Sequence, residues 1–126
     1  MILFLDTTDK EVTKLALLSE SRVVQHEWQS RYDQEETFLT SLEKFFKKTK
    51  IKISDINKIA VVPGPGLFSR VRLGVVSANA LALALGIKVI EVPQKSAIVF
   101  EKINALQQKD TIHPFYDKQP NITKPK

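Results

Sequence analysis

The chain has 126 residues, of which 43% are hydrophobic and 26% charged. This is the size of one domain and the composition of an ordinary globular protein with a real core. The absence of cysteine excludes disulfide scaffolds, thiolate zinc sites and cysteine nucleophiles, and it fits a reducing compartment. The apolar runs at residues 1–5 and 81–85 are too short for a signal peptide or a membrane span. We therefore expect a cytoplasmic protein that does not associate with membranes.

The net charge is +5 and the isoelectric point is near 9.5, an excess that can help a protein approach RNA. A group of five lysines contributes much of it: Lys44, Lys47, Lys48, Lys50 and Lys52. No aromatic residues alternate with these lysines, as stacking platforms for bases would. We favour the interpretation that they form a solvated helix face, so that any contact with RNA is indirect or weak.

The first thirty residues predict three strands. Residues 2–6 form an apolar run that ends at a turn-prone stretch, and residues 13–18 and 22–29 follow with short connections between them. Parallel neighbours would need a crossover of about a dozen residues or more. The three strands are therefore expected to form an antiparallel meander.

The period then changes to that of a helix over residues 33–49. Phe38, Leu42, Phe45 and Phe46 recur at helical spacing. Asp33 with Glu36 three positions later has the pattern of a capping box, which predicts where the helix begins.

The second half predicts two further strands, each followed by a helix. Residues 58–62 form a strand that Pro63 ends, and residues 69–85 form an apolar, alanine-rich helix with Gly86 after it. Residues 88–92 form the last strand, and residues 96–107 can form a third helix. Three prolines interrupt any periodicity after residue 109.

The predicted order is β-β-β-α-β-α-β-α, an α/β fold with a mixed five-stranded sheet. We expect one lobe over residues 1–108 and an extended C-terminal tail over residues 109–126. The element order is that of the ribonuclease-H-like unit, which also forms each lobe of the actin-like, Hsp70 and sugar kinase superfamily.

The segment after the fourth predicted strand reads Gly64-Pro65-Gly66-Leu67-Phe68-Ser69-Arg70-Val71-Arg72. It resembles the signature of the TsaB (YeaZ) family, which usually reads Gly-Pro-Gly-Ser-Phe-Thr-Gly-Leu-Arg. The residues that match are Gly64, Pro65, Gly66, Phe68 and Arg72. Leu67 and Arg70 depart from the pattern, and Arg70 replaces a glycine.

Three other segments resemble the same family: residues 2–8, residues 80–87 and the tail from residue 114. Members of that family carry a second lobe between the third helix and the tail. Here residues 104–112 join the two directly, so we expect a shortened form that lacks most of the second lobe.

Hydrolysis by two metal ions needs several carboxylates that converge on the ions. Asp6 supplies one at the end of the first strand, but the fourth strand ends in Val62 and Pro63. His26 and His113 are far apart in the sequence, and neither has a second histidine at helical spacing. We therefore expect no catalytic residue, no metal site and no cofactor.

Nucleotide binding is the main alternative. In the superfamily that the fold resembles, the first turn approaches phosphates, which makes Asp6, Thr7 and Thr8 weak phosphate candidates. The glycine loop before the second helix could help, together with Arg72. A tight strand-to-helix turn with positive φ explains Gly64 and Gly66 without any ligand, and we favour that interpretation.

The resemblance implies a non-catalytic subunit that binds and stabilises a TsaD-like transferase, which modifies adenosine 37 of tRNA with an N6-threonylcarbamoyl group. It also implies a TsaE-like ATPase as a second partner. In the family, the first two helices pair with their counterparts on TsaD. We assign a partner seam, which would form a homodimer when the chain is alone, to Phe38, Leu42, Phe46, Ser77, Leu81 and Leu85. The alternatives are a nucleotide-binding remnant and a self-associating module without a tRNA role.

Overall fold

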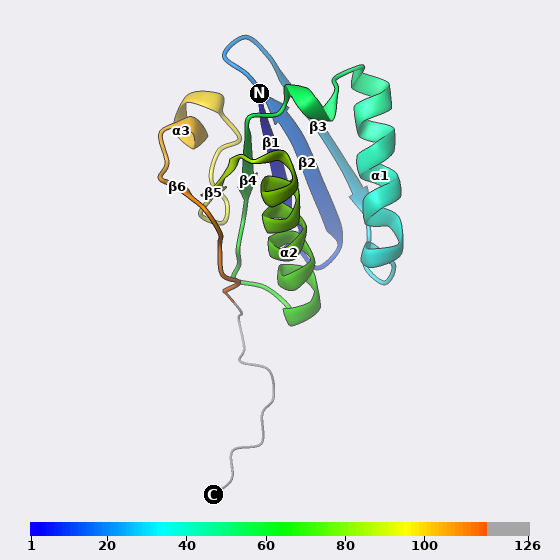
Figure 1. Ribbon diagram of the computed structural model, residues 1–126. Helices are drawn as coiled ribbons and strands as arrows, with labels where there is room; N and C mark the ends of the chain where they lie inside the picture. The colour runs from blue at the N-terminus through cyan, green and yellow to red at the C-terminus, as the bar shows by residue number, and fades with distance from the viewer. Residues whose placement is uncertain (116–126) are drawn as a thin grey trace, which may run out of the picture.

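The computed structural model describes residues 1–115, which fold into one six-stranded sheet with helices on both faces (Figure 1). The strand order is β3-β2-β1-β4-β5-β6. The strands are β1 (Ile2–Asp6), β2 (Val12–Leu18), β3 (Val23–Gln29), β4 (Lys58–Val61), β5 (Lys88–Glu91) and β6 (Gln108–Lys109). The α/β class and the antiparallel β1–β2–β3 meander are confirmed, whereas the predicted count of five strands is wrong by one.

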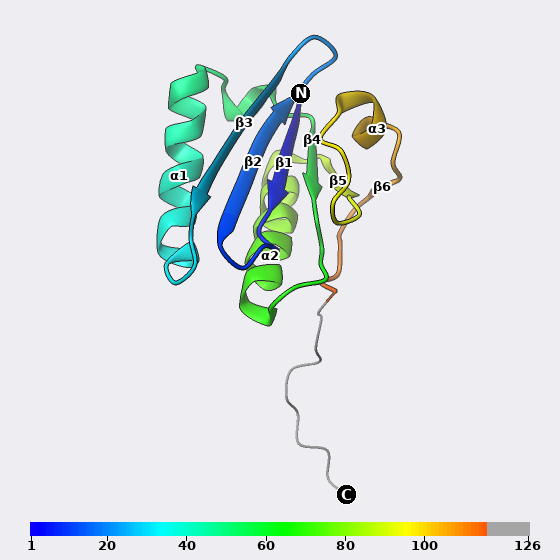
Figure 2. The same cartoon turned by 180° about the vertical axis from the view of Figure 1, so that it is seen from behind.

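The helices are α1 (Gln34–Thr49), α2 (Phe68–Leu85) and α3 (Phe100–Asn104), with a short 3-10 turn, η1 (Ile53–Asp55). Both α1 and α2 cover one face of the sheet, and Figure 2 shows the sheet from the opposite side. Among the described residues, α2 has the length and apolar composition of a membrane span. Its buried face, which includes Val71, Val75 and Ala78, instead packs on the sheet as a core helix does.

The central strand β1 sends alternate side chains into two separate cores. Leu3 and Leu5 join the core beneath α1 and α2, whereas Ile2 and Phe4 join the smaller core beneath α3. This alternation follows from the two-residue period of a strand. Strand β1 pairs antiparallel with β2 and parallel with β4, so it is buried on both faces and both edges.

The segment after α3 returns to the sheet. Strand β6 lies antiparallel to β5 and covers an edge that would otherwise expose unpaired backbone groups. Ile112 is 3% exposed and reaches the core beneath α1 and α2. The side-chain amide of Asn79 on α2 both donates to Ile112 O and accepts from Ile112 N, each at 2.9 Å. Residues 108–112 are thus packed on the lobe, while the remainder of the predicted tail beyond residue 115 lies outside the described residues.

Two local predictions need correction and one is confirmed. Asp33 is the residue before α1, but its side chain makes no capping hydrogen bond, so the capping box does not form. The third helix is shorter than predicted, because Val99 is extended and the helix begins only at Phe100. Gly86 ends α2 in the left-handed conformation with φ of 68°, as predicted.

Candidate functional site

A buried arginine joins three turns at one end of the sheet. Arg70, in the first turn of α2, is 5% exposed and donates from Nη1 to Asp9 O at 2.8 Å and from Nη2 to Ser30 O. Its own carbonyl accepts a hydrogen bond of 2.6 Å from Thr7 Oγ1. The residue that departs from the family signature is therefore integrated into the fold.

The same network reaches the first turn of α1. Gln34 donates from Nε2 to Thr13 Oγ1 at 2.8 Å and to Thr7 O at 3.2 Å. The hydroxyls of Thr13 and Ser30 are bonded at 2.6 Å. Because Ser30 and Thr7 also bind Arg70, these contacts tie the beginning of α1 to the beginning of α2.

Electrostatics at this end of the sheet follow from burial and turn geometry. Burial lowers the pKa of Arg70, and the carboxylates of Asp9 and Asp33 act in the opposite direction. The pKa of Asp9 lies below its ordinary value, chiefly because Glu11 N donates to the carboxylate at 2.8 Å, with Val12 N donating as well. Asp9 thus remains ionised and holds the β1–β2 turn.

The phosphate candidates are occupied by contacts within the protein. Asp6 Oδ1 accepts from Thr8 N at 2.9 Å and from Thr8 Oγ1 at 2.7 Å. Gln94 also donates to Thr8 Oγ1, at 3.2 Å. Thr7 is fully buried, and Thr8 is 6% exposed. A phosphate at this turn would have to displace several of these hydrogen bonds.

Glycine is favoured at positions 64 and 66 of the signature loop for two different physical reasons. Gly64 has φ of 133°, and a Cβ there would lie 1.7 Å from Phe115 O, so both conformation and space require glycine. The prediction of a positive φ at Gly66 is wrong. A Cβ at that position would instead approach Val71 Cγ2 to 3.0 Å, so glycine is favoured by the close packing of the loop against α2. Phe68 and Arg72, also in the signature, are exposed at the start of α2.

The residues assigned to the partner seam divide into two groups. Phe38 and Leu42 are 1% and 7% exposed and belong to the core, so packing inside the lobe accounts for both. The other four are only partly buried: Phe46, Ser77, Leu81 and Leu85. The predicted seam left out three apolar side chains of the two helices that are more exposed, namely Leu39 at 72%, Val76 at 56% and Leu83 at 85%.

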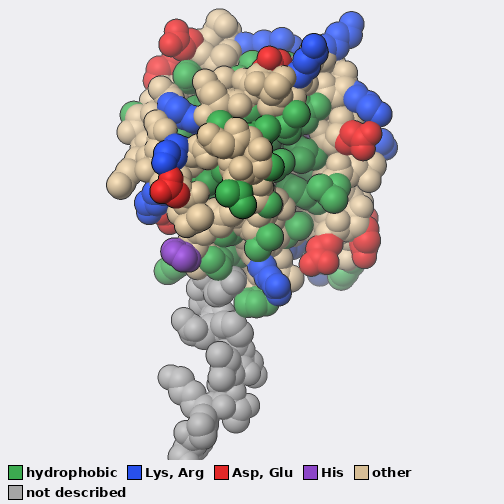
Figure 3. All heavy atoms as spheres, in the orientation of Figure 1, with side chains coloured by type: hydrophobic (Ala, Val, Ile, Leu, Met, Phe, Trp, Pro, Cys, Tyr) green, Lys and Arg blue, Asp and Glu red, His purple; other side chains and the backbone are tan. Residues whose placement is uncertain are grey.

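Two hollows lie on the outer surface of α1 and α2. A hollow of about 560 Å³ lies along α1 and includes Leu39, Phe46 and Ile53 in its lining. A second hollow of about 360 Å³ lies between Glu35 of α1 and the α2 residues Arg72, Leu73, Val76 and Ser77. Figure 3 shows hydrophobic side chains gathered over α2 and between the two helices. We call the two hollows together the α1–α2 groove; the exposed Leu39 lines the first and the exposed Val76 lines the second.

A three-stranded meander extended by two parallel strands, with two helices over one face, defines a lobe of the ribonuclease-H-like and actin-like class. Residues 28–113, about two thirds of the chain, match the family model described as "TsaD: tRNA N6-adenosine threonylcarbamoyltransferase". The chain belongs to this family.

Solved structures extend the comparison. The chain is 29% identical to "YeaZ from Pseudomonas aeruginosa", with a TM-score of 0.67. It is also 29% identical, with a TM-score of 0.68, to an uncharacterized protein "with similarity to peptidase YEAZ from Pseudomonas aeruginosa". Each match covers 73% of this chain but only 44% and 42% of the two relatives, so the chain spans less than half their length. No curated protein matches. The resemblance to the TsaB (YeaZ) family is confirmed.

Proposed function

We propose that this chain is a non-catalytic partner subunit that binds and stabilises a TsaD-like transferase in the synthesis of tRNA N6-threonylcarbamoyladenosine at position 37. The observation that carries the proposal is the α1–α2 groove, in which the exposed Leu39 lines the hollow along α1 and the exposed Val76 lines the hollow beside α2. A contiguous exposed apolar surface marks an interaction site. The likeness of the chain to YeaZ, at 29% identity, supports a role in this tRNA modification.

Burial of the exposed side chains in the groove would supply part of the free energy of association. Burial of an apolar side chain contributes about 1.5–3 kcal/mol. Leu39 and Val76 are 72% and 56% exposed, so burying what remains of them would contribute roughly 2–4 kcal/mol before the costs of association are subtracted. In the absence of a partner, the same surface would form a symmetric homodimer.

The remaining parts of the proposal follow from the family. The protein acts in the cytoplasm, a TsaE-like ATPase is its second partner, and its contact with tRNA is indirect or weak. Nucleotide binding is not favoured, because Thr7 and Thr8 are engaged in hydrogen bonds within the lobe. Calorimetry with ATP and ADP should accordingly show no saturable heat.

The test is co-purification with the TsaD-like protein of the same cell, followed by a modification assay with and without this chain. Leu39→Asp and Val76→Asp should each abolish co-purification while the circular dichroism spectrum stays unchanged. Val23→Asp is the matched control, because Val23 is 44% exposed on the edge strand β3, outside the groove. Capture of the transferase by the Leu39→Asp and Val76→Asp variants at the wild-type level would refute the proposed surface.

A further inference from the structure

A further cavity, apart from the α1–α2 groove, lies between the carboxyl ends of β4 and β5. The chain leaves β4 toward α2 on one face and leaves β5 toward α3 on the opposite face. In open α/β sheets, the crevice at such a switch point is where ligands bind. The cavity has a volume of about 550 Å³, which is within the usual range for small-molecule sites.

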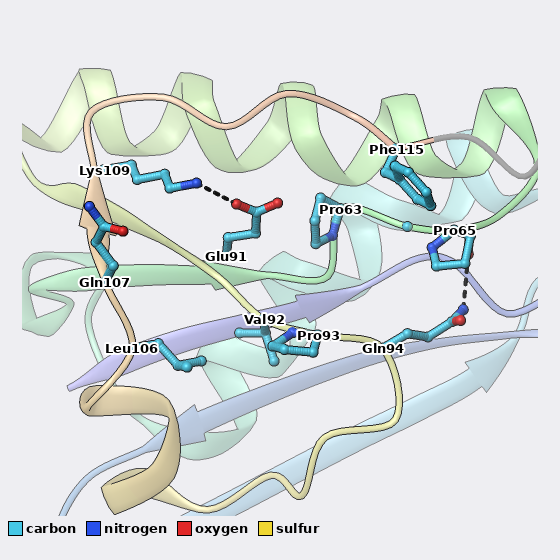
Figure 4. A pocket seen from close by; sticks show the side chains of 11 residues that line it. Pro63, Pro65, Glu91, Val92, Pro93, Gln94, Leu106, Gln107, Lys109 and Phe115 are labelled. Carbon is cyan, nitrogen blue, oxygen red and sulfur yellow. Dashed lines mark hydrogen bonds and ion pairs between the residues drawn. The ribbon is translucent and has the colours of Figure 1, made fainter. Parts of the chain in front are cut away.

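Most of the cavity wall is apolar. Pro63 and Pro65 come from the loop after β4, and Val92 and Pro93 come from the end of β5. Leu106 and Phe115 complete the wall from the returning segment, and the Phe115 ring lies beside Pro65 in Figure 4. Phe115 is 60% exposed and is held by a hydrogen bond of 2.7 Å from its N to Pro63 O. This end of the cavity suits a flat apolar group.

The charged groups of the cavity form one pair. Lys109 Nζ lies 2.6 Å from Glu91 Oε2, and the side chains are 42% and 39% exposed (Figure 4). Ion pairs with this degree of exposure contribute little to stability, so a ligand can compete for both charges. A phosphate or a simple carboxylate would meet Lys109 but would also face the like charge of Glu91. A ligand with both an ammonium and a carboxylate group satisfies both residues.

We propose that this cavity binds a free α-amino acid with an apolar or aromatic side chain. Glu91 binds the ammonium group, Lys109 binds the carboxylate, and the side chain lies against Pro65, Pro93 and Phe115. The site is separate from the α1–α2 groove, since the two share no lining residue. A ligand in this cavity and a partner on the groove would therefore not compete for the same residues.

The experiment is a titration of the full chain, labelled with ¹⁵N, with L-phenylalanine, followed by the amide signals of Val92, Lys109 and Phe115. We expect saturable shifts confined to this cavity. The analogue 3-phenylpropionate lacks the ammonium group and 2-phenylethylamine lacks the carboxylate, so each should bind at least about tenfold more weakly. Equal binding of either analogue, or no saturable shift with L-phenylalanine, would overturn the proposal.

Substitutions at the ion pair give a readout that a structural role would not produce. Glu91→Gln should weaken binding of L-phenylalanine and strengthen binding of 3-phenylpropionate, because the like charge is removed. Lys109→Met should weaken both ligands. The matched control is Lys88→Met, which removes the exposed ion pair between Lys88 and Asp110 outside the cavity and should change neither affinity. If Glu91→Gln weakens both ligands alike, Glu91 does not bind the ammonium group.

Discussion

Replacement of Arg70 by Met removes the guanidinium from the centre of the buried network while keeping an unbranched apolar side chain in place of the arginine stem. Two carbonyl oxygens, of Asp9 and Ser30, lose a charged donor. Hydrogen bonds to charged groups contribute about 1.5–3 kcal/mol each, so the two bonds together account for roughly 3–6 kcal/mol. Relief of the desolvation that lowers the pKa of Arg70 offsets part of this sum. We expect a net loss of about 2–4 kcal/mol.

Urea unfolding followed by circular dichroism measures this loss as a shift in the midpoint with an unchanged slope. The matched control is Arg72→Met, two residues further along the same helix but exposed; its stability should change by less than about 0.5 kcal/mol. Arg70→Lys should be intermediate, because an ammonium group is a point charge and cannot reproduce the planar fork of the guanidinium. If Arg70→Met unfolds at the wild-type midpoint, the network does not stabilise the lobe.

Three further outcomes follow from the geometry. Asp9→Asn should remove a pH-dependent contribution to the free energy of unfolding. Because the pKa of Asp9 is lowered in the folded protein, this contribution is complete above the ordinary pKa of 3.8 and is lost as the pH falls further. The stabilities of wild type and variant should therefore converge in acid unfolding curves. Gly64→Ala should destabilise the lobe by more than about 1 kcal/mol, because the residue has a positive φ and its Cβ would approach Phe115 O. Calorimetric melting measures this loss. Asn79→Ala should accelerate hydrogen exchange at Ile112 and lower stability by about 1–3 kcal/mol, since both bonds to the Ile112 backbone are lost; unchanged exchange would contradict this account.

The regular elements could be predicted because their residues follow simple periods. The Phe38, Leu42 and Phe45 spacing marks the buried face of α1, and all three side chains are in the core. The same pattern could not separate a face that covers the sheet from a face that meets a partner. Leu39 lies immediately beside that stripe, yet it is the most exposed apolar residue of α1.

Features that depend on residues far apart in the sequence escaped prediction. Arg70 is distant from its partners Asp9 and Ser30, and no local spacing connects them. The feature of the sequence that could have indicated this network is Arg70 itself, which stands where the TsaB signature usually has glycine. Strand β6 has only two residues, both polar and exposed, and such a segment carries no period. It is a strand because it lies beside the edge of β5.

Because β1 lies at the middle of the sheet, one of its two edges stays unpaired while the rest of the chain is being synthesised. Its partner β2 follows at once, but β4 begins only at Lys58, 52 residues after Asp6. At about 5–20 residues per second, translation needs roughly 3–10 s to cover that interval. During this time the edge of β1 that later pairs with β4 leaves its backbone N–H and C=O groups unpaired, and other chains can bind there. Slower elongation or crowded expression should therefore favour aggregates seeded by β1, and early supply of a chaperone should reduce them.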